Sequence, residues 1–90
     1  MRRSGVRRRV GGITLVAASG EPGPPRVAVV VGRSVGSAVR RNRAKRRLRE
    51  ALCRCPLRDG RDYVVAGGQE AVGAPFETLV SWLTRALEEE

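Results

Sequence analysis

A serine near the middle of the chain has a spacing that could support nucleophilic chemistry. The segment Gly32-Arg33-Ser34-Val35-Gly36 fits G-x-S-x-G, the turn that exposes a catalytic serine between a strand and a helix in hydrolases. Such a serine needs a general base within hydrogen-bond reach, and the sequence contains no histidine. Its single lysine, Lys45, would lie roughly 16 Å further along the predicted helix. We therefore interpret the segment as a tight turn, in which Ser34 or Ser37 caps that helix.

The helix predicted after this turn carries an unusual density of positive charge. Between Arg40 and Arg49, seven of ten residues are Arg or Lys, and only Glu50 offers an acidic neighbour within the helix. Like charges three or four residues apart repel by about a few tenths of a kcal/mol per pair. We therefore favour phosphate binding over a solvated basic face whose arginines lie across apolar neighbours. Asn42, among these arginines, could reach a base edge or a ribose hydroxyl, or bond the helix backbone.

The distribution of charge along the chain also favours a polyanionic partner. Residues 1–61 contain 17 basic and 3 acidic side chains, a net charge of +14, and residues 62–90 contain 1 basic and 6 acidic, a net of −5. Anionic lipid is a weaker candidate, because the basic segments lack the large apolar face of a membrane-surface helix. Nucleic acid is therefore the better partner, and nothing in the sequence indicates a protein partner.

Other features narrow the class of protein further. No apolar run approaches about twenty residues, which excludes a membrane span. The N-terminus has positive charge but no apolar core, so it does not resemble a secretory signal, and we expect a cytoplasmic protein. Cys53 and Cys55 are too close for an unstrained disulfide, and the sequence offers no further Cys or His to complete a metal site, so we expect both thiols to be free.

Hydrophobic periodicity and turn residues divide the chain into a basic arm, residues 1–10, disordered without a partner, and a single α+β domain, residues 11–90. The predicted strands are residues 11–18, 26–31 and 62–66, the helices are 37–54 and about 75–90, and residues 57–61 and 67–74 are loops. The first two strands should form an antiparallel hairpin through residues 19–25, and the strands flanking the first helix could be parallel neighbours. The order β-β-α-β-α predicts a small two-layer sandwich.

Each predicted helix has an apolar stripe that would pack on the sheet. In the first helix the stripe consists of Ala44, Leu48, Ala51 and Leu52. In the second it consists of Phe76, Leu79, Val80, Leu83 and Leu87. Trp82 lies off the second stripe, where it could cover an edge.

The residues of the basic helix resemble a known signature. Ala38-x-x-Arg41-Asn42-Arg43-x-Lys45-Arg46 is similar to the RNR motif of the bacterial ribonuclease P protein component. The strand and turn before the helix and the Asp62-Tyr63-Val64 strand after it also resemble that family, and the similarity covers roughly Gly11 to Glu88. The motif in its strand–turn–helix context is much more specific than G-x-S-x-G.

This resemblance implies a fold, a function and a site. The fold would be similar to domain 2 of ribosomal protein S5, with a left-handed β-α-β crossover. The chain would be the non-catalytic protein subunit of the endoribonuclease ribonuclease P, whose RNA subunit removes the 5′ leader from precursor tRNA with Mg²⁺ bound mainly by RNA. The RNR helix would face the catalytic RNA, and a cleft beside the sheet would hold the leader. The implied RNA-contacting residues are Arg41, Asn42, Arg43, Lys45 and Arg46, with Arg40, Arg47 and Arg49 as supporting phosphate contacts.

The sequence departs from the family pattern at its beginning. Family members usually start with a basic helix whose aromatic residues help to line the leader cleft, whereas here a predicted strand follows Val10 and no aromatic residue precedes Tyr63. Leader binding would then depend on backbone and arginine contacts. The alternative function is a general structured-RNA-binding protein, ribosomal or architectural, without a role in tRNA processing.

Overall fold

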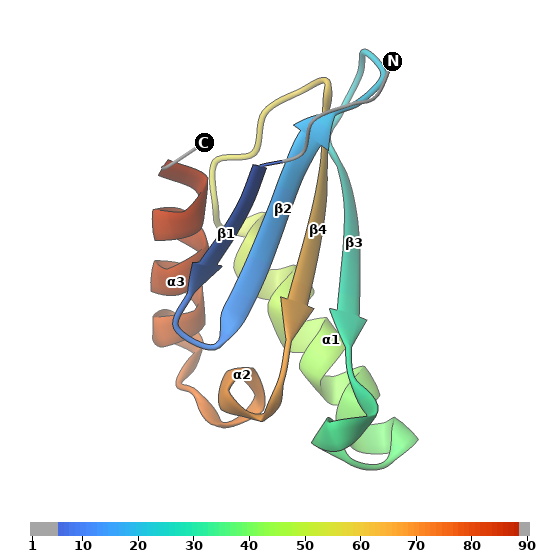
Figure 1. Ribbon diagram of the computed structural model, residues 1–90, viewed down its shortest axis with the longest axis vertical. Helices are drawn as coiled ribbons and strands as arrows, with labels where there is room; N and C mark the ends of the chain where they lie inside the picture. The colour runs from blue at the N-terminus through green and yellow to red at the C-terminus, as the bar shows by residue number, and fades with distance from the viewer. Residues whose placement is uncertain (1–5, 89–90) are drawn as a thin grey trace.

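A computed structural model describes residues 6–88 of the chain and shows an α+β fold with one four-stranded sheet (Figure 1). The elements in chain order are β1 (Val6–Val10), β2 (Ile13–Ser19), β3 (Arg26–Val31), a 3-10 turn η1 (Arg33–Val35), α1 (Ala38–Cys53), β4 (Arg61–Gly67), α2 (Gln69–Gly73) and α3 (Phe76–Glu88). Helices packed on one sheet were predicted, and this fold class is confirmed.

The first strand, β1, corrects the prediction of a disordered basic arm. Residues 6–10 pair antiparallel with β2, and the turn between Val10 and Ile13 contains only Gly11 and Gly12. Gly11 has a φ of +57°, a conformation that glycine adopts at little cost. A Gly-Gly pair is a typical two-residue hairpin turn. The prediction of a disordered arm gave more weight to the run of arginines that precedes this pair. The part of the arm from residue 1 to 5 lies outside the described residues.

The order of strands in the sheet is β1-β2-β4-β3, so the predicted hairpin of residues 11–18 and 26–31 is wrong. β4 lies between β2 and β3, antiparallel to the first and parallel to the second. The parallel neighbours predicted on either side of the first helix are confirmed. In Figure 1 β3 and β4 both point down the page, β4 lies to the left of β3 and α1 passes behind the sheet, which makes this crossover left-handed, against the usual rule.

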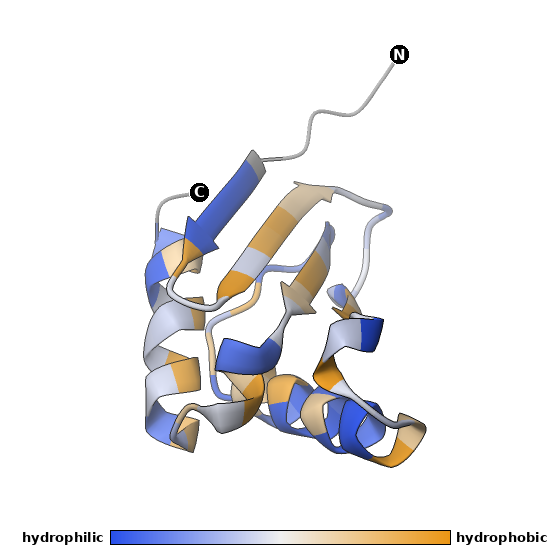
Figure 2. Ribbon diagram, turned by 60° about the horizontal axis from the view of Figure 1, so that its bottom comes forward, coloured by the Kyte–Doolittle hydropathy of each residue, from blue (hydrophilic) through white to orange (hydrophobic). Residues whose placement is uncertain are grey.

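In the part of the chain that the structure describes, helices cover one face of the sheet and leave the other face bare. Side chains from alternate positions of β2 and β4 are buried against α1 and α3, among them Ile13, Leu15, Tyr63 and Val65. On the opposite face Val30 of β3 remains 51% exposed. The result is a two-layer arrangement, and Figure 2 shows that β1, at the sheet edge, is hydrophilic along most of its length.

The C-terminal part differs from the prediction in one element. Residues 67–74 were predicted as a loop, but they contain the short helix α2, which packs beside β4 and η1. α3 begins at Phe76, close to the predicted start, and buries Leu79, Leu83, Ala86 and Leu87, while Phe76 and Val80 are partly buried against the same core. Residues 89–90 of the predicted helix lie outside the described residues.

Trp82 of α3 covers the hairpin between β1 and β2. Its indole ring occupies the space that a Cβ atom would need at Gly11 and contacts the corresponding position at Gly12. The predicted role of Trp82 as an edge cover is therefore confirmed. It explains the glycine at position 11, whereas a Cβ atom at Gly12 would first meet the Cβ of Glu70, at 2.6 Å.

Candidate nucleic-acid interface

The turn before α1 serves to start the helix. The Ser37 hydroxyl oxygen accepts a hydrogen bond from the backbone N–H of Arg40 at 3.3 Å, which makes Ser37 the N-cap. Gly36, with a φ of +128°, precedes it, and its carbonyl oxygen accepts a hydrogen bond from Arg41 Nη1 at 2.8 Å. Ser34 lies in η1, where its backbone carbonyl oxygen accepts from Gln69. The turn therefore positions the basic helix, as predicted.

The buried side of α1 is the predicted one. Ala44, Leu48, Ala51 and Leu52 pack against the sheet and α3. Since this apolar stripe is narrow, the basic residues occupy the outer side of α1 and its two flanks. One flank faces α2 and α3, and the other faces the sheet edge at β3.

Arg47 lies on the flank that faces α2, and its guanidinium is held by backbone carbonyls. Nη1 donates to the carbonyl oxygens of Val72 at 2.7 Å and Ala71 at 3.4 Å, and Nη2 donates to that of Ala74 at 2.7 Å. These are the carbonyls that the end of a helix leaves without a partner. We expected Arg47 to support phosphate binding, but its guanidinium donates to these backbone carbonyls and so connects α1 to α2.

Arg41 and Arg40, at the start of α1, also contact the protein itself. Arg41 is half-buried through its bond to Gly36, and the Arg40 side chain lies across Gly36, with Cδ 3.1 Å from the position of a Cβ there. Arg40 is nevertheless exposed. Both residues remain at the surface, but Arg41 has fewer free donors than its neighbours.

The other predicted site residues are available to a ligand. Asn42, Lys45, Arg46 and Arg49 line a shallow groove along the outer side of α1, and Arg43 is exposed beside it. Within residues 6–88 no hydrogen bond or ion pair joins these five side chains to the rest of the chain. Between Asn42 and Arg49 these five side chains thus form a row of donors with no acceptor among the described residues, which is the arrangement that a phosphate backbone can satisfy.

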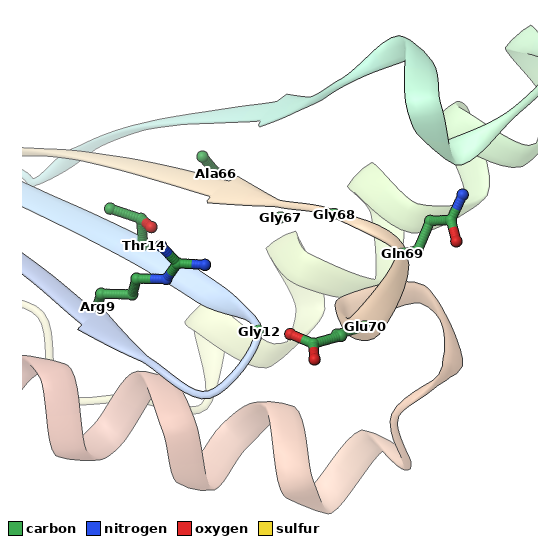
Figure 3. Close-up of a pocket in the computed structure, with 8 residues that line it drawn as sticks. All are labelled: Arg9, Gly12, Thr14, Ala66, Gly67, Gly68, Gln69 and Glu70. Atoms are coloured by element: carbon green, nitrogen blue, oxygen red, sulfur yellow. The ribbon is translucent and has the colours of Figure 1, made fainter.

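Several surface residues were not singled out from the sequence. Arg7 and Arg9 of β1 are exposed on the bare face of the sheet, where Arg9 pairs in register with Thr14. At the end of that face a hollow is lined by Arg9, Thr14, Gln69 and Glu70 together with Gly12, Gly67 and Gly68, and the Gln69 side chain points away from Arg9 (Figure 3). The alternation of exposed arginines in a strand could have indicated Arg7 and Arg9, had residues 6–10 been recognised as a strand.

The two cysteines are free, as predicted. Cys53 is exposed near the end of α1, while Cys55 is buried and lies 3.3 Å from the Ala51 carbonyl oxygen and 3.6 Å from the Thr84 hydroxyl oxygen. Burial raises the pKa of the Cys55 thiol, and the hydrogen bond with Thr84 partly offsets this effect. Among residues 6–88 there is no cluster of three or more His, Cys, Asp or Glu side chains that could hold a metal ion.

The fold and this surface define a class, that of small α+β proteins that carry an arginine-rich helix at the surface. The helices in the described part of the chain are all too short or too polar to cross a membrane. The sequence model of the family described as Ribonuclease P matches residues 1–90, and the chain belongs to that family.

Relatives with established names agree with this assignment. The chain is 48% identical over 66 residues to the ribonuclease P protein component of Bartonella quintana, a match that covers 69% of this chain and 49% of that protein. It is 43% identical over 91 residues to the same component of Ruegeria pomeroyi, covering 91% and 72% of the two chains. The match thus spans about half the length of the Bartonella protein.

Solved structures show the same fold. The RNase P protein from Thermotoga maritima superimposes with a TM-score of 0.80 at 25% identity, over 97% of this chain and 84% of that one. The Staphylococcus aureus RNase P protein gives a TM-score of 0.74 at 20% identity, over 94% and 80%. The prediction that the chain has the fold of ribonuclease P proteins is therefore confirmed.

Proposed function

We propose that this chain is the protein subunit of ribonuclease P, which binds the catalytic RNA subunit and precursor tRNA and assists removal of the 5′ leader. The observation that carries the proposal is the row of uncommitted donors on α1, in a chain that belongs to this family. Asn42, Arg43, Lys45, Arg46 and Arg49 would contact the RNA subunit, with Arg40 and Arg41 at the start of the helix.

The bare face of the sheet is the surface that we assign to the precursor tRNA leader. Arg7 and Arg9 stand along β1 with their side chains exposed, and the hollow beside Arg9 continues the face toward α2. Arginines can bind the leader phosphates, and the glycine backbone of the hollow allows close approach.

Catalysis in this proposal belongs to the RNA and its bound Mg²⁺. The protein would supply positive charge and position, which reduce the Mg²⁺ concentration needed for substrate binding. Bacterial precursor tRNA is made in the cytoplasm, so the protein would act there. Ser34 would have no catalytic role, because the sequence has no histidine to act as a base for its hydroxyl.

The test is cleavage of a precursor tRNA by a bacterial ribonuclease P RNA at low Mg²⁺, with and without the chain. We expect strong stimulation by the unmodified protein, and much weaker stimulation by the double variant Arg43→Ala, Arg46→Ala. Arg85→Ala is the matched control, because Arg85 is an exposed arginine of α3 outside the basic helix.

The alternative function, a general structured-RNA binder, predicts a different result. Tight RNA binding without any stimulation of cleavage would favour it over a ribonuclease P subunit. Stimulation that is unchanged in the double variant would show that α1 is not the RNA-binding surface.

A further inference from the structure

An apolar hollow lies on the flank of α1 that faces the sheet edge. It has a volume of about 250 Å³ and is lined by Val27, Arg49, Leu52, Cys53 and Leu57. Leu52 is buried and forms its floor, Val27 and Leu57 are half-buried walls, and Arg49 and Cys53 are exposed. β3 is the last strand of the sheet, so no further strand covers Val27 from that side.

This hollow adjoins the basic groove described above at Arg49. Arg49 lines both of them, and the groove residues Asn42, Lys45 and Arg46 precede it by one to two turns of α1. One turn advances the helix by about 5.4 Å. A nucleic-acid strand whose phosphates follow the groove would therefore place the nucleotide next to Arg49 at the mouth of the hollow.

The chemistry of the hollow suits a base and not a phosphate. Three of its lining side chains are aliphatic, and a phosphate enclosed among them would lose its hydration without compensation. A purine or pyrimidine ring is flat and largely apolar on its faces, and it can lie against aliphatic walls while its phosphate stays on Arg49. The volume is below the range of about 300–1,000 Å³ typical of pockets for drug-sized ligands, which also fits a single ring system.

We propose that this hollow binds one unpaired base of the RNA that lies along α1, with Arg49 on the adjoining phosphate. The inference rests on the proposed RNA binding of α1 and adds a preference for an unpaired nucleotide at that position. A fully paired strand keeps its bases inside the duplex and cannot fill the hollow.

The first experiment compares two RNA hairpins that differ by one unpaired nucleotide in the stem. The unmodified chain should bind the hairpin with the unpaired nucleotide about tenfold more tightly, which corresponds to burial of roughly 55 Å² of apolar base surface at about 25 cal/mol per Å². Leu57→Asn should remove most of this preference, because it places a polar group in the apolar wall. Val80→Asn is the matched control, since Val80 is a half-buried residue of α3 that does not line the hollow.

A second measurement uses the unmodified chain and does not depend on the folding of a variant. Cys53 lines the hollow and is exposed, while Cys55, the other thiol, is buried. With both hairpins at saturation, the one with the unpaired nucleotide should slow alkylation of Cys53 by iodoacetamide several-fold more than the fully paired one, because a base held in the hollow covers the Cys53 thiol.

The outcomes separate this inference from the proposed function. If both hairpins bind equally and protect Cys53 equally, the base site is wrong; Arg46→Ala should still weaken both complexes, and the proposed function stands. If the hollow takes an apolar side chain of a protein partner instead, neither RNA will protect Cys53, which also overturns the inference. If neither hairpin binds at all, the proposed function itself fails.

Discussion

The guanidinium of Arg47 in α1 donates a hydrogen bond of 2.7 Å to the carbonyl oxygen of Val72 in α2, and this bond joins the basic helix to the segment after β4. The same side chain reaches Ala74, and the other end of α2 is joined to the turn before α1 by the bond of 2.6 Å from Gln69 to Ser34. α2 thus contacts both the turn before the basic helix and the middle of that helix, and these contacts fix the position of α1 relative to β4.

The contacts of Arg47 predict that its loss lowers the stability of the protein more than the loss of its neighbour Arg46 does. Arg47→Ala should lower the free energy of unfolding by about 1.5–3 kcal/mol, because it removes a charged donor from buried or half-buried carbonyls. Arg46→Ala should change it by less than about 0.5 kcal/mol, as is usual for an exposed residue. Urea denaturation of both variants measures the difference, and equal effects would contradict the structural role of Arg47.

The exposed arginines predict that the affinity for RNA falls with salt concentration, with a slope that gives the number of phosphate contacts. For every phosphate that a variant no longer binds, the slope of log K against log salt concentration falls in magnitude by about 0.7–0.9. Arg46→Ala should therefore reduce the slope for RNA binding by nearly one, whereas Arg85→Ala should leave it unchanged. Titrations at several salt concentrations test this, and an unchanged slope in Arg46→Ala would remove Arg46 from the site.

The packing of Trp82 on the hairpin of β1 and β2 predicts that two glycine substitutions lower the free energy of unfolding by different amounts. Gly11 and Gly60 both have positive φ values, +57° and +77°, but only at Gly11 would a Cβ atom meet the indole ring. Gly60→Ala should cost about 1–2 kcal/mol from the backbone alone, and Gly11→Ala should cost about 1–3 kcal/mol more from overpacking. Thermal denaturation gives both values, and the fluorescence of the single tryptophan should change only in Gly11→Ala.

The buried thiol of Cys55 predicts a loss of stability at alkaline pH. Because burial raises its pKa in the folded protein, the unfolded chain loses the thiol proton first as the pH rises. Stability should be unaffected by this group below the ordinary thiol pKa of about 8.5 and should fall as the pH rises above it through the folded pKa. The decline between pH about 7.5 and about 9.5 should be smaller in Cys55→Ser, whose hydroxyl does not titrate there. An equal decline in both proteins would rule out this thiol as the cause.

Local features of the sequence determined the helix that carries the basic residues and the apolar stripe that this helix buries. The Ser37 cap, the apolar spacing of Ala44, Leu48 and Leu52, and the density of arginine all act within a few turns of one helix, so α1 and its basic outer side were predictable. The parallel relation of β3 and β4 was also predictable, because a helix stands between them.

The tertiary structure alone decided how these elements are arranged and which arginines remain free. The insertion of β4 between β2 and β3 depends on pairing between residues far apart in the chain, which no local pattern encodes. In the same way Arg47 and Arg46 are neighbours with the same side chain, and only the position of α2, about 25 residues later, makes one a structural contact and leaves the other free. Sequence periodicity places a side chain on a flank of a helix, but its partner across that flank is fixed by packing.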